Sequence, residues 1–168
     1  MKERGPDKFM VGTVVITVLI LAAAAVFGSG MGATTQVTTD GQVAISVDSN
    51  RYDWGNIDIS GGGVSKSFAI ESSGDVPLKL YNVKTSCMCT TAQLKTTSQT
   101  SPKFNMHDQT SSVFEVKPGE TAELIIEFDP AFHGPSGIGP ISRTITMNTN
   151  DPRNPTLSFN LTAQVVKN

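Results

Sequence analysis

The chain has 168 residues, with 13 Lys and Arg against 15 Asp and Glu, 38% hydrophobic residues and two cysteines. A net charge of −2 without a Lys/Arg cluster argues against nucleic-acid binding, which depends on neutralising phosphates. Two cysteines also exclude a disulfide-dense miniprotein. The length fits one ordinary domain together with an additional segment.

The first predicted element is an apolar segment, residues 9–27, that contains no charged side chain. Its length of about 19 residues is close to the roughly 20 that an α-helix needs to cross the hydrocarbon layer. Basic residues precede the segment, whereas none follows it before Arg51, so the positive-inside rule places residues 1–8 in the cytoplasm. We therefore expect a single-pass protein of the cytoplasmic membrane, with residues 9–27 in the lipid bilayer and the rest on the extracytoplasmic side.

An alternative for the same segment is a cleaved secretory signal, with the small residues Gly28, Ser29 and Gly30 at the cut site. The apolar run exceeds the roughly 7–15 residues of such a signal, which favours the uncut anchor. Residues 28–41 are small, polar and rich in Gly and Thr, a composition typical of a flexible spacer. Both interpretations export the domain of residues 42–168.

The exported residues 42–168 alternate apolar and polar side chains over several short segments. Each segment predicts a β-strand with one buried face, and turns rich in Gly and Pro separate the segments. About seven such strands predict an all-β fold, an immunoglobulin-like antiparallel sandwich with Trp54 in its core, and a closed barrel is the alternative. The alternating apolar positions are Val43, Ile45 and Val47; Val64, Phe68 and Ile70; Leu78 and Leu80; Leu124, Ile126 and Phe128; Ile141, Ile145 and Met147; and Leu157, Phe159, Leu161, Ala163 and Val165.

One stretch interrupts this pattern, residues 90–112, which is rich in Thr, Ser and Gln and poor in apolar residues. Loops of such length are usually functional or disordered. We therefore predict disorder or a mobile surface loop over residues 90–112.

Several phrases of the sequence, in chain order, form a specific set. They are Tyr52–Ile57, Val64–Ile70, Ser73–Gly74 with Pro77–Leu78, Ser86–Thr90, Lys117–Glu120, Phe128–Pro130 and Asn148–Pro152. As a set they resemble the bacterial domain of unknown function 1573 family, over most of residues 48–166. The resemblance implies an exported bacterial domain with an immunoglobulin-like sandwich, related in shape to the major sperm protein and pilus chaperone folds. The biochemical role of that family is not established.

The chain departs from the family pattern at two places. The pattern usually reads Ser-Cys-Gly-Cys-Thr, whereas Met88 stands here at the glycine position. A side chain there argues against a tight turn that needs a positive φ between the cysteines. The long insertion after Thr90 is the second departure.

The residues with chemical potential are Cys87 and Cys89, two positions apart. On an extended strand both sulfurs would point to one face and Met88 to the other. A disulfide between them is then difficult, because residues i and i+2 of a strand lie at or beyond the roughly 7 Å Cα separation that permits bridging. On that geometry, we expect any such bond to be strained and easily reduced.

Three interpretations of the cysteine pair stay open. Both residues can be small buried hydrophobic side chains at the end of a strand, since free cysteine is among the most buried residue types. They can form a soft-metal site for copper(I) or zinc, with Met106, His107 or His133 completing the ligand shell. They can also form a redox-active or intermolecular disulfide.

No motif of an enzyme active site is present, and no nucleophile motif accompanies either His107 or His133. We therefore predict that the protein is not an enzyme and acts as a binding or structural module of the cell envelope, without a resident cofactor. Open sandwich edges offer strand addition as the contact with an envelope protein. The alternative is an envelope protein for copper, zinc or thiol-redox chemistry that uses Cys87 and Cys89.

Overall fold

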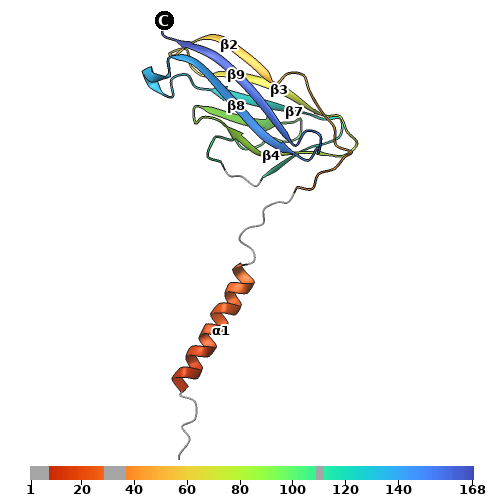
Figure 1. Ribbon diagram of the computed structural model, residues 1–168, viewed down its shortest axis with the longest axis vertical. Coiled ribbons are helices and arrows are strands. Elements are labelled where there is room, and N and C mark those ends of the chain that lie inside the picture. The colour runs from red at the N-terminus through yellow and green to blue at the C-terminus, as the bar shows by residue number, and fades with distance from the viewer. Residues whose placement is uncertain (1–7, 29–36, 109–111) are drawn as a thin grey trace, which may run out of the picture. The chain divides into compact units, whose positions relative to one another are not determined.

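The computed structural model describes residues 8–28, 37–108 and 112–168. The chain separates into two compact units, Met1–Thr34 and Thr35–Asn168. The first unit contains helix α1, Lys8–Gly28, which matches the predicted helix within one residue at each end (Figure 1). Its side chains are described from Met10 to Leu21. Across the residues that the structure describes in full, no helix has the length and apolar character of a membrane span.

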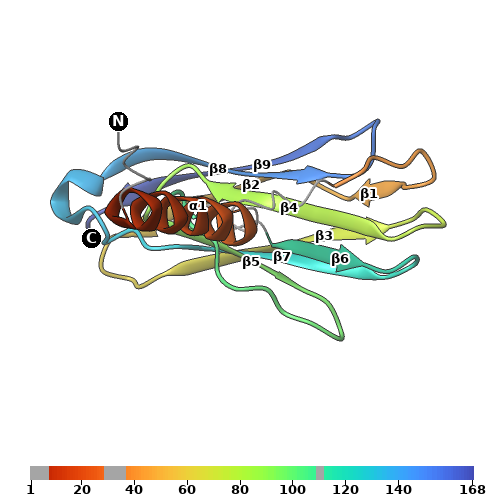
Figure 2. The same cartoon turned by 90° about the horizontal axis from the view of Figure 1, so that it is seen from below.

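The second unit is an all-β domain of two sheets (Figures 1 and 2). One sheet has the strand order β1-β3-β7-β5, and the other has the order β2-β9-β8-β4-β6. Most of the predicted spacer, residues 29–36, lies outside the described residues. The elements of the domain are β1 Ile45–Val47, β2 Arg51–Asp58, β3 Val64–Ser72, β4 Leu78–Thr85, β5 Thr90–Lys95, β6 Val113–Val116, β7 Thr121–Phe128, the 3₁₀ turn η1 Gly134–Gly137, β8 Gly139–Thr149 and β9 Thr156–Val166.

The hydrophobic core lies between the two sheets. Phe68 of β3 and Phe159 of β9 meet across it, with ring centroids 5.1 Å apart. Burying a side chain of this size fully contributes roughly 1.5–3 kcal/mol. The alternation predicted from the sequence is confirmed for most of the core, and Leu94 and Val116 join it without having been predicted. The largest fully buried side chains are Phe159, Ile70, Leu78, Leu80, Leu94, Leu124, Ile126, Ile145, Met147, Leu161, Val43 and Val116.

The sandwich differs from the prediction in strand number and in the direction of one pair. The described part of the domain has nine strands rather than about seven, because β2, β5 and β6 lack an obvious alternation in the sequence. Strand β2 also pairs with β9 in parallel, so the sandwich is not antiparallel throughout. The register shifts between Asp53 and Asn56, where Gly55 has a φ of +68°. Parallel pairing to a distant strand leaves no signal in the local sequence.

The predicted disorder or mobile loop over residues 90–112 is wrong for most of that stretch. Strand β5 pairs with β7 along its whole length, and the side chains of Thr90, Ala92 and Leu94 are buried. Phe104 is also buried, and its backbone exchanges two hydrogen bonds with Ala92, of 2.9 and 2.7 Å. Residues 109–111 lie outside the described residues. The prediction failed because the polar composition of the stretch indicated a loop, whereas the inward side chains of β5 are mostly small.

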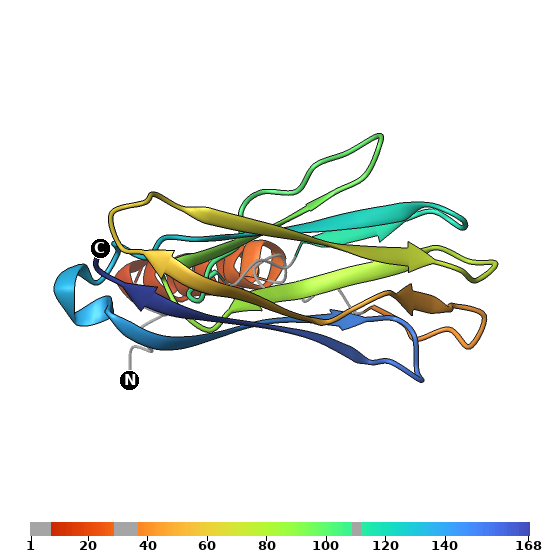
Figure 3. The same cartoon turned by 90° about the horizontal axis from the view of Figure 1, so that it is seen from above.

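The domain has two ends with different chemistry, at opposite ends of the strands (Figure 3). The hairpin end comprises the β8–β9 turn, residues 150–155, with the neighbouring loops 73–77 and 117–120. The cysteine end comprises residues 86–89, the β7–β8 connection of residues 129–138, and the start of β3 at residues 63–65. The candidate site lies at the cysteine end.

Candidate functional site

The two cysteines lie in a turn between β4 and β5, not on an extended strand as predicted. The turn brings the Cα atoms of Cys87 and Cys89 to 5.3 Å, and the two side chains form a disulfide. This separation is well inside the range that permits bridging, so the predicted difficulty does not arise. The Thr90 N–H donates to the carbonyl of Cys87 at 3.2 Å and closes the turn.

Met88 occupies the middle of this turn and points to solvent, with 41% of its surface exposed. Among the described non-glycine residues, only Asn82 has a positive φ. The turn therefore closes with an ordinary backbone conformation at Met88, and a side chain is accepted there.

The two sulfurs of the disulfide have unequal surroundings. Cys89 is 3% exposed and packs with Ile57, Phe128 and Val165, whereas Cys87 is half-buried. The Cys89 N–H donates to the Cys87 Sγ at 3.3 Å. One residue of the pair is thus partly open to solvent, and the other is buried.

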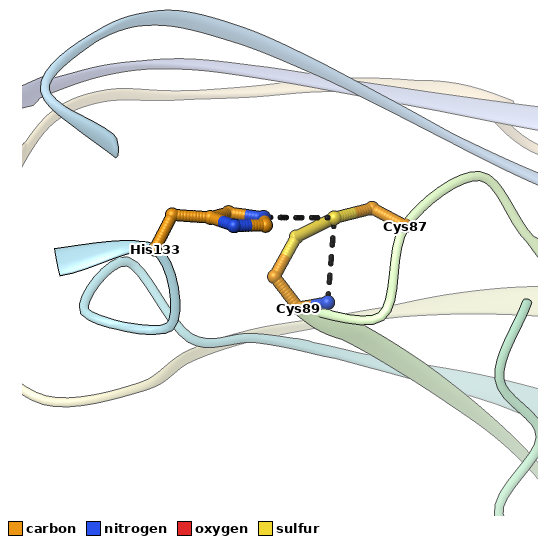
Figure 4. Close-up of side chains that lie close together, drawn as sticks. All are labelled: Cys87, Cys89 and His133. Carbon is orange, nitrogen blue, oxygen red and sulfur yellow. Dashed lines mark hydrogen bonds between the residues drawn. A yellow bond between two sulfur atoms is a disulfide. The ribbon is translucent and has the colours of Figure 1, made fainter. Parts of the chain in front are cut away.

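A histidine from a distant part of the chain completes the cluster. The His133 Nε2 lies 3.4 Å from the Cys87 Sγ, and Figure 4 shows the imidazole directed at that sulfur. The β7–β8 connection that carries His133 is attached to the cysteine turn, because the Asp129 N–H donates to the carbonyl of Cys89 at 2.9 Å. The Ser136 hydroxyl donates to the His133 carbonyl at 2.7 Å and holds the connection in shape.

The structure brings His133, and not His107, to the cysteines. The ligand atoms of Cys87, Cys89 and His133 lie within 4.8 Å of one another, the one such group found among the described residues. His107 is exposed in a separate turn, where its N–H donates to the Asn105 Oδ1 at 2.8 Å. Met106 lies in the same turn and is 39% exposed. Of the three residues predicted to complete a ligand shell, only His133 is placed to do so.

Arg143 on β8 contacts the buried sulfur, and the sequence interpretation missed it. Its Nε–H donates to the Cys89 Sγ at 3.1 Å, and its guanidinium lies over the ring of Phe128, 5.3 Å from the centroid. Burial lowers the pKa of Arg143. The described carboxylates form ion pairs with Lys103 and Arg153 but not with Arg143. Arg143 shares the parity of Ile141 and Ile145, and a cation on the inward face of a strand is the signal that could have found it.

A hollow of about 640 Å³ opens beside the cysteine turn. Phe132, which is 50% exposed, lines it together with Met88 and Cys89. Glu127 and Asp129 add carboxylates to its wall. The hollow therefore combines apolar contact area with negative charge.

Trp54 is half-buried and stacks on Phe128, with ring centroids 5.9 Å apart. Its indole N–H donates to the carbonyl of Ser65 at 3.5 Å. It packs against both hydrophobic clusters of the domain but stays half-buried, so it lies at the margin of the predicted core. Through Phe128 it also supports the residues that line the hollow.

Comparison with known families gives one match over most of the domain. Residues 45–165 match the family described as "Protein of unknown function (DUF1573)". The chain belongs to this family. Membership in DUF1573 confirms the resemblance seen in the sequence phrases, and it leaves the biochemical role open. No curated protein matches the chain significantly.

Three solved structures are similar to the chain to different degrees. A protein of unknown function from Porphyromonas gingivalis is 26% identical with a TM-score of 0.55, and the match covers 79% of this chain and 50% of that one. The chain thus spans half the length of the Porphyromonas protein. The PapD-like domain 7 of human CEP192 is 13% identical with a TM-score of 0.48, covering 80% of this chain and 93% of that one. An MSP family member from C. elegans is 16% identical with a TM-score of 0.39, covering 76% and 100%.

Proposed function

We propose that this DUF1573 protein is an extracytoplasmic binding module that contacts its partner through the cysteine end. The observation that carries the proposal is the hollow beside the cysteine turn, with exposed Met88 and Phe132 on its wall. Ile138, which is 44% exposed, adds a third large apolar side chain at the same end. Exposed apolar side chains that gather at one place are typical of interaction sites.

The proposal includes a membrane anchor at residues 9–27 and an extracytoplasmic location for the domain. Its support is the uncharged apolar sequence, the helix over Lys8–Gly28, and the basic residues that precede the segment. The disulfide also supports export, because disulfides persist in oxidising compartments and are rare in the cytosol. Protease added to spheroplasts of the source bacterium should degrade the domain without lysis. Degradation only after lysis would contradict the location.

The sheet edges favour the cysteine end over strand addition as the contact. Strand β1 has three residues and β6 has four, and the edge of β5 is bridged by Thr100 and Phe104. Strand β2 is longer, but its register shifts between Asp53 and Asn56. Short, covered or irregular edges are the devices that prevent a sheet from pairing with another chain.

A photo-cross-linking amino acid placed at Met88 tests the contact site in living cells. Met106 is the matched control, because it is a methionine of nearly equal exposure, 39% against 41%, in a different turn. We expect a discrete cross-linked partner band from position 88 and none from position 106. Equal bands from both positions, or a band from position 106 alone, would contradict the proposed site.

A second candidate function is thiol or metal chemistry at the cysteine pair, favoured by the proximity of His133. When reduced, Cys87, Cys89 and His133 offer two sulfurs and one nitrogen, a donor set that suits copper(I) or zinc. Thiol counting before and after reduction, with metal analysis of the same sample, tests this candidate. Stoichiometric metal that is lost on His133→Ala but kept on His107→Ala would support a metal site. A disulfide that stays intact under mild reductant, in a protein with no metal bound, would exclude the candidate.

A further inference from the structure

We propose that the Cys87–Cys89 disulfide is a thiol–disulfide exchange centre with a fixed polarity, in which Cys87 is attacked and Cys89 leaves as a thiolate beside Arg143. The proposal rests on the second candidate function and selects thiol exchange over metal binding. The substrate class is a dithiol. Three properties of the site carry the argument: the unequal exposure of the two cysteines, a guanidinium that no described carboxylate neutralises, and the donors around Cys87.

Unequal exposure decides which sulfur is attacked. An incoming thiolate must reach a sulfur atom to form the mixed disulfide, so access selects between the two. Cys87 is half-buried, whereas Cys89 is 3% exposed and lies among apolar side chains and the guanidinium of Arg143. Attack at Cys87 is therefore favoured, and Cys89 becomes the leaving group.

The contact of Arg143 with Cys89 favours the same polarity. A disulfide sulfur is neutral and accepts hydrogen bonds weakly, so the partly buried guanidinium gains little from the Nε–H contact at 3.1 Å. No described carboxylate pairs with Arg143 in its place. When the bond opens, the Cys89 thiolate supplies the negative charge that the guanidinium lacks, and the hydrogen bond becomes charge-assisted. Arg143 thus stabilises the leaving group and acts as a positioning residue for the exchange.

The groups around Cys87 serve the second step, in which Cys87 leaves the mixed disulfide. The backbone N–H of Cys89 already points at the Cys87 Sγ, at 3.3 Å, and the His133 Nε2 lies 3.4 Å away (Figure 4). Both can donate a hydrogen bond to a thiolate. Each sulfur of the pair therefore has its own donors when it carries charge.

The exchange balances without a further reactant. The first thiolate of the substrate forms a bond to the Cys87 Sγ, the bond between Cys87 and Cys89 breaks, and Cys89 takes the electron pair. The second thiolate of the substrate then attacks the substrate sulfur that is bonded to Cys87, and the Cys87 thiolate is released. The substrate is oxidised to a disulfide and the protein is reduced to a dithiol. The two protons of the substrate thiols end on Cys87 and Cys89.

The same cation argues against a metal as the resident ligand. A guanidinium that donates to the Cys89 Sγ places a positive charge within hydrogen-bond distance of one of the metal donors. Like charges at such short range repel strongly in a partly buried site. A thiolate is stabilised by Arg143, whereas a copper or zinc ion at the same sulfur is opposed.

Trapping the mixed disulfide on the unaltered full-length protein, in mild detergent, tests the polarity. The oxidised protein is treated with limiting glutathione, quenched with acid, alkylated with N-ethylmaleimide and mapped by mass spectrometry. We expect glutathione on Cys87 and the maleimide on Cys89. Glutathione mainly on Cys89, or equally on both, would overturn the polarity while leaving thiol chemistry at the pair intact. A disulfide that glutathione does not open at all would overturn both this inference and the redox form of the second candidate.

The role of Arg143 is tested by the rate of reduction of the disulfide. Arg143→Met should slow reduction by glutathione about tenfold, the change expected when one charge-assisted hydrogen bond to the leaving thiolate is lost. Arg143→Lys should recover much of the rate, because it restores a cation near Cys89. Arg153→Met at the hairpin end is the control and should react at the unaltered rate. An unchanged rate in a folded Arg143→Met protein would contradict the role of Arg143, and the trapping experiment decides the polarity should that variant not fold.

Discussion

The dipeptide Asp-Pro follows a strand at each end of the sandwich and makes the same local hydrogen bond in opposite surroundings. The Asp129 Oδ1 accepts the Ala131 N–H at 2.9 Å, and the Asp151 Oδ1 accepts the Arg153 N–H at 2.9 Å. Asp129 is exposed at the cysteine end, whereas Asp151 is completely buried at the hairpin end. The same local hydrogen bond thus lies at the surface in one turn and has a buried acceptor in the other.

The polar groups of the hairpin end are joined to one another. The side chain of Asn150 accepts the Lys79 N–H at 2.8 Å and donates to the carbonyl of Pro77 at 3.1 Å. The Asp151 Oδ2 accepts the Asn154 Nδ2–H at 2.9 Å, and Arg153 donates to the carbonyl of Val43. At the cysteine end, by contrast, a cation faces a neutral sulfur and large apolar side chains face water. The hairpin end is thus organised for the stability of the fold, whereas the cysteine end keeps the exposed groups on which the proposed contact depends.

The largest expected effect on stability comes from filling a close backbone approach at the hairpin end. A Cβ on Gly74 would lie 2.3 Å from the Gln42 O and 2.5 Å from the Ala44 N. Because these are backbone atoms, Gly74→Ala should lower the free energy of unfolding by about 3 kcal/mol. Gly63→Ala at the cysteine end is the matched control, since its nearest atom is the Phe128 O at 3.5 Å, and it should cost less than about 1 kcal/mol.

Urea unfolding of residues 35–168, which form a compact unit with its own core, measures both glycine variants. Equal losses of unfolding free energy in the two variants would contradict the proposed difference in packing between the two ends.

The two aspartates provide a second, smaller contrast. Asp151→Ala removes a fully buried acceptor of three part-buried hydrogen bonds, two from Arg153 and one from Asn154, so it should lower the free energy of unfolding by about 2 kcal/mol. Asp129→Ala removes the same backbone hydrogen bond at the surface, where water replaces the carboxylate, and should cost about 0.5 kcal/mol. Thermal and urea unfolding of both variants test the pair. A cost for Asp129→Ala as large as that for Asp151→Ala would show that the turn, and not its burial, carries the energy.

The smallest expected effect is a dependence of the hairpin end on acid. Burial opposes ionisation of Asp151, but hydrogen bonds from Asn154 and Arg153 outweigh it and lower the pKa of this carboxyl. The pKa of Glu120, at the same end, is lowered chiefly by the backbone N–H of Lys117. Because the folded pKa values lie below the unfolded ones of about 4, this stabilisation is complete above about pH 4 and is lost as the pH falls through the folded values.

Unfolding free energies of the domain measured between pH 6 and pH 2 should therefore decline on the acid side, and Asp151→Asn should flatten the decline. Hydrogen exchange should show the hairpin end opening before the cysteine end. If the unfolding free energy of Asp151→Asn declines with acid as steeply as that of the unaltered protein, Asp151 does not cause the decline.

Strict alternation made the main strands predictable, because Phe68, Leu124 and Phe159 recur with apolar neighbours two residues away. Strand β5 was not predicted, because its inward side chains Thr90 and Ala92 are small or polar. Such a composition is typical of a loop. The parallel pairing of β2 escaped because the register is set by β9, more than a hundred residues later in the chain.

At the site, the sequence identified the cysteines, but the prediction placed them on an extended strand instead of in a turn. Residues two apart are neighbours in any conformation, yet whether they can bridge depends on a turn that the Thr90 N–H closes. The choice between His107 and His133 depends on which connection folds back onto the cysteine turn, and that is decided by tertiary contacts. Such contacts between distant segments carry no local pattern to read.

Met88 has a consequence for how the family can diversify. The cysteine turn closes without a left-handed residue, so its tip can carry any side chain while the sulfur pair below it keeps its geometry. Under the proposed function, a single codon change at this position would alter the contact surface of the tip and leave the disulfide below it in place. The proposed contact and the proposed exchange chemistry can thus change independently, although three consecutive residues carry both.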